Sequence, residues 1–172
     1  MAEGRLKAEQ RQFIPVTFTL NGKPQEIQVE PHELLIDVIR NRFGFTGTKR
    51  SCDVQVCGAC TVLVDGRPLS SCTFLAFEAR GRDVLTIEGL AQNGKLHPLQ
   101  QAFIEHGGFQ CGFCTPGMIL AAKSLLDQNA NPTRQEIIHF MDGNICRCTG
   151  YKKILESIQA AAKTLRQRGS RV

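Results

Sequence analysis

Eight cysteines in a chain of 172 residues constrain the fold more than any other feature, because they fall into two groups of four. The first group is Cys52, Cys57, Cys60 and Cys72. Its spacing, C-x4-C-x2-C with a distant fourth cysteine, is typical of a plant-type [2Fe–2S] cluster. One short loop must then present three thiolates and backbone N–H groups together, which the small residues of "CGAC" permit. A zinc site favours two similar short hooks, so the spacing predicts an iron–sulfur site.

The second group of four consists of Cys111, Cys114, Cys146 and Cys148. Taken alone, its two hooks could hold either zinc or a cluster. Cys114 and Cys148 each stand directly before an expected helix start, at Thr115 and Thr149. Two helix N-termini would therefore direct partial positive charge and free N–H groups at an anionic site. Zinc and a cluster carry the same charge when four thiolates bind them, so only the pairing with the first group favours a second cluster.

The remaining sequence argues against a disulfide-bonded secreted protein. The segment 1–12 is polar and lacks the hydrophobic centre of a secretory signal. We interpret it as a flexible N-terminal arm. No apolar run approaches the roughly 20 residues that cross a bilayer. We therefore expect a cytoplasmic protein, in which clustered cysteines more often bind metal than form disulfides.

The formal net charge of +5 raises the possibility of nucleic-acid binding. Loading two oxidised clusters would deprotonate eight thiols and add two cores of charge +2, which lowers the net charge to +1. No basic stripe with interleaved aromatic residues is present either. We expect no nucleic-acid partner and no membrane insertion.

The first half of the chain has the pattern of a small mixed sheet. Residues 13–20 alternate apolar and polar side chains, Asn21-Gly22 is a strong hairpin signal, and residues 24–30 supply the returning strand. A helix is expected to begin at Pro31 and end near Gly44. The further expected elements are a second hairpin over 61–72 turning at Asp65-Gly66, and a short strand in 83–90.

The second half has helical apolar spacing instead. Start signals support it, because Thr115-Pro116 places a capping hydroxyl before proline and Thr133 to Glu136 forms a capping box. We expect four helices stacked as a bundle, on the apolar spacing of Leu99, Phe103, Ile104, 118–126, Ile137, Ile138, Met141, Ile154, Ile158, Ala161 and Leu165.

The segments "CDVQVCGACTV", "QCGFCTPGM" and "ICRCTGY" resemble the small iron–sulfur subunit of molybdenum hydroxylases, the xanthine dehydrogenase and aldehyde oxidase family. The resemblance covers about residues 14–165. It implies an α+β fold, with an N-terminal β-grasp, plant-ferredoxin-like domain and a C-terminal four-helix bundle domain. The expected division is an arm at 1–12, a ferredoxin-like [2Fe–2S] domain at 13–89, a helical [2Fe–2S] domain at 90–167 and a tail at 168–172.

The resemblance also implies a role. Cys52, Cys57, Cys60 and Cys72 would hold the cluster on the flavin side, and Cys111, Cys114, Cys146 and Cys148 the cluster nearest molybdenum. Electrons would pass singly from a molybdopterin centre through two [2Fe–2S] clusters to a flavin. The molybdopterin, in a dinucleotide form, and FAD would belong to a large and a medium partner subunit. Gln110 and Cys148 would lie beside the pterin. No residue of this chain is expected to be catalytic.

Two other functions remain open at this stage, a free-standing two-cluster ferredoxin and a zinc-binding structural module. The sequence also departs from the family pattern, because many members have glycine where this chain has Ser51 and Gln55. Gln55 must then adopt a positive φ or let the loop relax, which bears on the N–H···S bonds of the first site.

Overall fold

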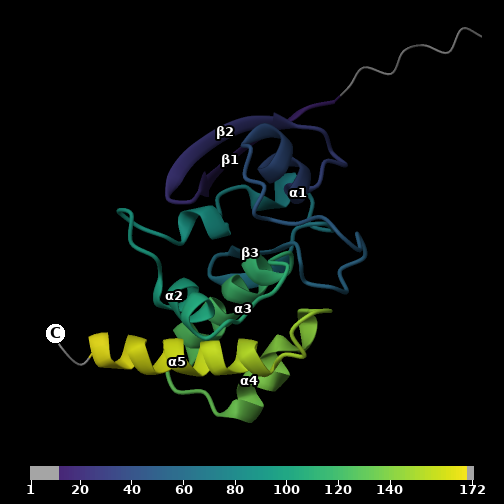
Figure 1. Cartoon of the computed structure of the whole chain (residues 1–172). Coiled ribbons are helices and arrows are strands. Elements are labelled where there is room, and N and C mark those ends of the chain that lie inside the picture. The colour runs from purple at the N-terminus through teal and green to yellow at the C-terminus, as the bar shows by residue number, and fades with distance from the viewer. Residues whose placement is uncertain (1–11, 170–172) are drawn as a thin grey trace, which may run out of the picture.

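The computed structural model describes residues 12–169, with side chains described through residue 167. A five-stranded mixed sheet with a short helix is followed by four longer helices, so the fold is α+β. In Figure 1 the hairpin of β1 and β2 lies at the top, and helix α5 (Lys152–Gly169) crosses the lower part of the molecule. The predicted arm and tail fall almost wholly outside the described residues, although α5 continues two residues into the segment assigned to the tail.

Two hairpins build most of the sheet, as predicted. The strands are β1 (Ile14–Leu20), β2 (Lys23–Val29), β3 (Thr61–Val64), β4 (Arg67–Ser70) and β5 (Asp83–Leu85). Asn21, Gly22, Asp65 and Gly66 all have positive φ, which two-residue hairpin turns require. β5 runs parallel to β1 and antiparallel to β3, which gives the order β2-β1-β5-β3-β4. The predicted strand over 83–90 is shorter than expected, because a 3₁₀ turn, η3 (Ile87–Gly89), follows it.

A short helical segment supplies apolar side chains to the core of the sheet. It consists of α1 (Leu35–Asp37) and a π-helical turn, η1 (Val38–Arg42). The prediction that this helix begins at Pro31 is wrong. Leu34 has extended backbone and pairs with Leu75 as an isolated bridge, so the helix cannot begin before Leu35. Leu35, Val38 and Ile39 pack with inward-facing residues of β1, β3 and β5 into one buried cluster.

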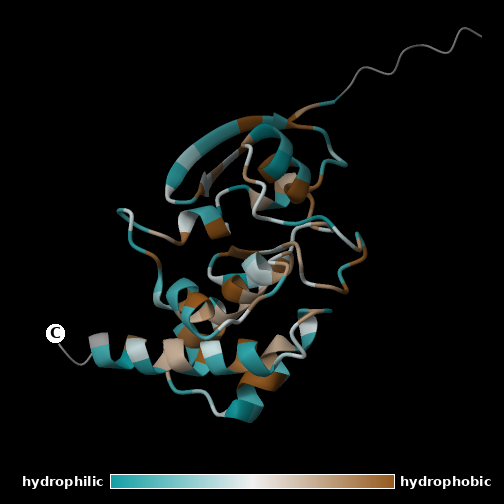
Figure 2. Cartoon of the chain, in the orientation of Figure 1, coloured by the Kyte–Doolittle hydropathy of each residue, from teal (hydrophilic) through white to brown (hydrophobic). Residues whose placement is uncertain are grey.

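All four helices predicted for the second half are present. They are α2 (Pro98–Glu105), α3 (Thr115–Gln128), α4 (Arg134–Phe140) and α5, and two 3₁₀ turns, η2 (Ala76–Ala79) and η4 (Met141–Gly143), complete the fold. The capping box of Thr133 and Glu136 is also confirmed. Figure 2 shows apolar and polar residues alternating around α5, as expected for a helix buried on one face. Among the described residues, no helix is long and apolar enough to cross a membrane.

Helix α3 joins the helices to the sheet. It packs against β3 and β4 as well as against α2 and α4, and nine of its fourteen residues are buried. Ser124 in the middle of α3 donates its hydroxyl to the carbonyl oxygen of Gly66 in the second hairpin (2.8 Å). The two halves of the chain are therefore in direct contact.

Candidate iron–sulfur sites

The first four predicted ligands converge at the loop between η1 and β3. Cys52, Cys57 and Cys60 lie in this loop, which we call the first cysteine loop (residues 51–60), and Cys72 approaches from the end of the second hairpin. The N–H of Cys57 donates to Sγ of Cys52 (3.5 Å). Cys60 and Cys72 are buried together against Ile36 of α1. One side of the site is thus shielded from water, while the Cys52 side is more open.

Backbone N–H groups and burial shift the pKa values of two thiols of this site in opposite directions. The N–H of Val54, followed by those of Cys57 and Val56, lowers the pKa of the Cys52 thiol to about 6. Burial raises the pKa of Cys72 to about 11, although the N–H of Gln55 opposes the shift. N–H bonds to sulfur stabilise negative charge there, which is what a thiolate ligand of an anionic cluster requires.

Gln55 shows how the loop tolerates the departure from glycine. Its φ is +60°, and Asp53 two residues earlier has φ +55°. The left-handed conformation therefore survives without glycine, and the Gln55 N–H lowers the pKa of the Cys72 thiol against the larger effect of burial. The hydroxyl of Thr73 donates to Oε1 of the exposed Gln55 side chain (3.1 Å). The loop therefore adopts the positive φ at Gln55 rather than relaxing away from it.

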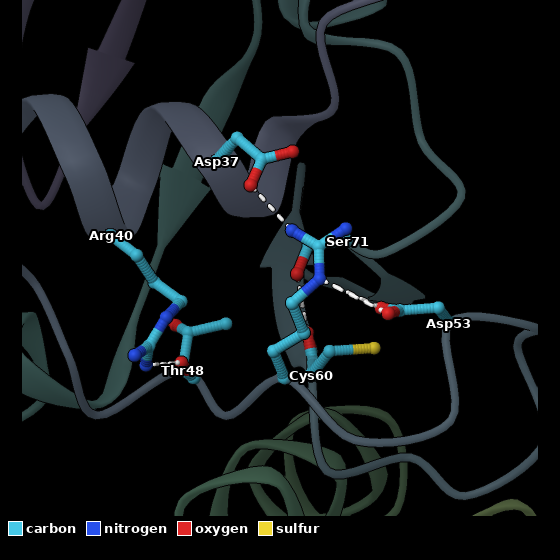
Figure 3. A network of polar contacts seen from close by, with 7 residues as sticks. Asp37, Arg40, Thr48, Asp53, Cys60 and Ser71 are labelled. Atoms are coloured by element: carbon cyan, nitrogen blue, oxygen red, sulfur yellow. Dashed lines mark hydrogen bonds and ion pairs between the residues drawn. The ribbon is translucent and has the colours of Figure 1, made fainter.

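A polar network anchors the first cysteine loop to the rest of the sheet unit (Figure 3). The guanidinium of Arg50 bridges Asp37 on α1 and Asp53 in the loop, with Nε 3.0 Å from Asp53 Oδ1. Ser71 donates its hydroxyl to the carbonyl oxygen of Cys60 (2.7 Å). Surface ion pairs contribute only about 0–1 kcal/mol, so we assign Arg50 to restraining the loop rather than to overall stability.

The second four predicted ligands come together below the first site. Sγ of Cys148 lies 3.6 Å from Sγ of Cys111, and the Cys114 thiol contacts Cys146. All four line a cavity of about 250 Å³, which Cys57 of the first site also borders. Cys111 and Cys148 are exposed, whereas Cys146 is buried. The second site therefore has one edge open to solvent and one edge directed at the first site.

Two neighbouring residues support Cys146 through hydrogen bonds. Burial opposes the shift, but the hydroxyl and N–H of Thr149 (3.1 and 3.4 Å) lower the pKa of the Cys146 thiol. The N–H of Cys146 in turn donates to the Tyr151 hydroxyl (3.0 Å). At Cys114, burial raises the thiol pKa to about 12. We did not predict the roles of Thr149 and Tyr151. The one available signal was that the only tyrosine of the chain stands three residues after Cys148.

The helix starts at this site differ from the prediction. Cys114 is the N-cap of α3, but Thr115 is its first helical residue and its buried hydroxyl has no hydrogen-bond partner, so Thr115 does not cap. The expected start at Thr149 is wrong, because α5 begins at Lys152. Gly150 and Tyr151 have φ of +60° and +66°, which interrupts a right-handed helix. One helix N-terminus, not two, directly follows a cysteine of the site.

The spacing of the sulfur atoms distinguishes a site for a single zinc ion from a site for a binuclear cluster. Within residues 12–169, no three His, Cys, Asp or Glu side chains lie close enough together to share a single metal ion. A tetrahedral ion with bonds of about 2.3 Å would hold all four sulfurs roughly 3.8 Å apart. An S–S distance within this range joins Cys111 and Cys148 (3.6 Å). The side chains of Cys146, Cys57 and Cys60 shift the thiol pKa values of Cys114, Cys52 and Cys72 respectively, which indicates the same pairing for the other thiols. Two thiolates for each of two irons fit a binuclear cluster better than one zinc ion.

Gln110 and Cys148, predicted to lie beside a pterin, are adjacent in space. The amide Nε2 of Gln110 donates to the carbonyl oxygen of Cys148 (3.0 Å), across 38 positions of sequence. Both residues are exposed. Exposed apolar side chains of Phe109, Phe113 and Ile145 come from the same two segments.

The chain matches two families of known domains. Residues 18–86 match the family described as "2Fe-2S iron-sulfur cluster binding domain". Residues 86–159 match the family described as "[2Fe-2S] binding domain". The two matches contain one group of four cysteines each.

Whole-chain relatives belong to oxidoreductase complexes. The nicotinate dehydrogenase small FeS subunit of Eubacterium barkeri is 47% identical over 150 residues, which cover 87% of this chain and 96% of the relative. The nicotine 6-hydroxylase small subunit of Paenarthrobacter nicotinovorans is 43% identical over 145 residues, with 84% and 87% covered. The aldehyde oxidoreductase of Megalodesulfovibrio gigas is 44% identical over 89% of this chain, which spans only 17% of that longer protein.

Solved structures agree with these relatives. A chain of quinoline 2-oxidoreductase from Pseudomonas putida 86 superimposes with a TM-score of 0.87 and 46% identity, covering 91% of this chain and 98% of that chain. The aldehyde oxidoreductase from Desulfovibrio gigas gives a TM-score of 0.86 and 42% identity, covering 90% of this chain and 17% of that chain.

Proposed function

The chain belongs to the small [2Fe–2S] subunits of molybdenum hydroxylases, and from this premise we propose that it carries electrons singly between a molybdopterin centre and a flavin on partner subunits. The observation that carries the proposal is the convergence of the eight cysteines in two adjacent groups of four, with the second group lining a cavity that the first group borders. Cys52, Cys57, Cys60 and Cys72 would ligate one cluster. Cys111, Cys114, Cys146 and Cys148 would ligate the other.

The cofactors supply the redox chemistry, since a [2Fe–2S] cluster accepts one electron at a time. The protein's own residues set the environment in which this happens. The N–H of Cys57 donates to a sulfur of the first set and that of Thr149 to a sulfur of the second, and the N–H groups of Val54 and Gln55 lower the thiol pKa values of Cys52 and Cys72. Ile36 excludes water from the Cys60 and Cys72 side. Hydrogen bonding to sulfur and solvent exclusion are two of the levers that set a cluster potential.

The exposed apolar side chains support two separate docking surfaces for partner subunits. Phe109, Phe113 and Ile145 come from the segments that form the exposed edge of the second site, together with Gln110 and Cys148. We assign this surface to the molybdenum subunit, with Gln110 and Cys148 contacting the pterin. Val54 and Val56, the most exposed apolar residues of the first cysteine loop, would face the flavin subunit. Clustered exposed apolar residues at a functional edge are typical of interaction sites.

The experiment is iron analysis combined with electron paramagnetic resonance after dithionite reduction. We expect about four irons per chain, because each four-thiolate [2Fe–2S] site holds two, and two distinct reduced signals. Cys60→Ser should weaken one signal and Cys114→Ser the other. Asn41→Ala, at an exposed residue of η1 that is not a proposed ligand, is the control and should change neither. Zinc in place of iron, or loss of both signals in either cysteine variant, would reject the proposal.

A further inference from the structure

The two candidate sites touch through their backbones. The N–H of Ile145 donates to the carbonyl oxygen of Cys57 (2.9 Å). Cys57 is a proposed ligand of the first cluster, and Ile145 directly precedes Cys146, a proposed ligand of the second. The first cysteine loop therefore meets the segment 143–149, which we call the last cysteine turn, without any intervening side chain.

Glycine makes this approach possible. Gly58 in the first cysteine loop has φ +67°, and a Cβ there would lie 2.4 Å from the carbonyl oxygen of Gly143 and 2.5 Å from Nδ2 of Asn144. A Cβ on Gly117 of α3 would lie 2.3 Å from the carbonyl oxygen of Gly58. No side chain larger than hydrogen fits at either position without moving backbone. The contact between the two units is thus as close as main chains allow.

Asn144 links the two segments through its side chain. It is only 7% exposed, and its Nδ2 donates to the carbonyl oxygen of Gly58 (3.0 Å) and to Oγ1 of Thr61 (3.2 Å). Thr61 itself donates its hydroxyl to the carbonyl oxygen of Gly58 (2.7 Å). Gly58 precedes Cys60 by two residues and Thr61 follows it directly. The single amide of Asn144 therefore holds the "CGAC" segment from both sides.

We propose that Asn144 is a positioning residue, which fixes the separation and relative orientation of the two clusters by joining the last cysteine turn to the first cysteine loop. This inference rests on the proposed electron-transfer function. Electron tunnelling falls exponentially with distance, so a small displacement between the sites slows transfer while leaving each site chemically intact. A buried amide with two good acceptors is also costly to leave unpaired, which makes the link rigid.

The direct test is the magnetic interaction between the two reduced clusters, which falls with the inverse cube of their separation. In Asn144→Ala and in Thr61→Val, we expect the iron content and the g-values of each cluster to stay as in wild type. The splitting of the electron paramagnetic resonance lines at low temperature should narrow in both variants, and it should narrow more in Asn144→Ala than in Thr61→Val. The Asn41→Ala variant should keep the wild-type splitting. A purely structural role for Asn144 would lower the unfolding temperature but leave the splitting unchanged. An unchanged splitting in both site variants would therefore overturn the proposal.

Hydrogen exchange of the Ile145 amide separates this inference from the proposed function. If Asn144 holds the two segments together, Asn144→Ala should lose protection at Ile145, whereas Asn41→Ala should not. Equal protection in wild type and Asn144→Ala would reject the positioning role even if both clusters are present. If the wild-type protein binds no iron but Asn144→Ala still loses protection at Ile145, the electron-transfer function is rejected and the link between the two segments is retained.

Discussion

At the scale of residues, the hydrogen bond between Cys146 and Tyr151 at the second site depends on an unusual backbone conformation of Tyr151. Tyr151 has φ +66°, an uncommon value for a bulky residue. This conformation turns its ring back toward the last cysteine turn, where its hydroxyl accepts from the N–H of Cys146 (3.0 Å). The ring also packs against the core of the helical unit. The backbone cost at Tyr151 is therefore offset by a bond that orients a proposed ligand.

We predict that Tyr151→Phe weakens the second site selectively. The ring would stay in place, but the N–H of Cys146 would lose its acceptor, a loss that costs about 1 kcal/mol or somewhat more. The expected result is a lower unfolding temperature and a shifted potential for one cluster, measured by redox titration followed by electron paramagnetic resonance. Thr73→Val removes a hydroxyl beside the first site instead, and any shift it causes should fall on the other cluster. A shift of both potentials by Tyr151→Phe would contradict a local role.

At the scale of elements, the sequence patterns predicted the presence of helices and hairpins more accurately than the residues at which they begin. The four helices of the second half and both hairpins follow from apolar spacing and turn residues, which are local signals. The start of α5 was missed because Gly150 and Tyr151 adopt positive φ, and nothing in the order of residues distinguishes "CTGY" from a capped helix start. The Pro31 start was missed because Leu34 pairs with Leu75, a contact across 41 positions of sequence.

The capping box at the start of helix α4 gives a prediction about stability. Thr133 Oγ1 accepts from the N–H of Glu136 (3.2 Å), and Oε2 of Glu136 accepts from the N–H of Thr133 (2.6 Å). Thr133→Ala should lower the free energy of unfolding by about 1 kcal/mol, measured by urea denaturation. Thr133→Ser keeps the hydroxyl and should lose much less.

Acid should remove the contribution of Glu136. Hydrogen bonds from the N–H and then the hydroxyl of Thr133 lower the pKa of Glu136 below its ordinary 4.5. A carboxyl whose folded pKa is lowered stabilises the fold above its unfolded pKa, and this contribution is lost as the pH falls through the folded value. The stability difference between wild type and Glu136→Gln should therefore be present at pH 7 and vanish in acid. A difference that stays constant from neutral pH into acid would mean that the charge of Glu136 plays no part.

At the scale of the whole molecule, cysteine spacing predicted two groups of four ligands but not how the groups meet. The bond between Ile145 and Cys57 joins residues 88 positions apart, and Gly58 and Gly117 look in the sequence like ordinary small residues. Their importance appears only when the chain is folded and the position of each Cβ can be examined. Contacts between units depend on the final packing of both, so no local pattern encodes them.

The closest of these contacts yields the last prediction. Alanine is a better helix former than glycine by about 1 kcal/mol, so Gly117→Ala in α3 would stabilise an isolated helix. Here its Cβ would lie 2.3 Å from the carbonyl oxygen of Gly58, and the backbone must move. We therefore expect a net loss of about 1–3 kcal/mol, as for other overpacked sites, and a weaker magnetic interaction between the reduced clusters. Gly143→Ala is the matched control, because its Cβ would meet nothing within 4 Å. The free energy of unfolding in denaturant and the low-temperature electron paramagnetic resonance spectrum should be measured for both variants. A Gly117→Ala protein as stable as wild type would show that the two units are not held in backbone contact.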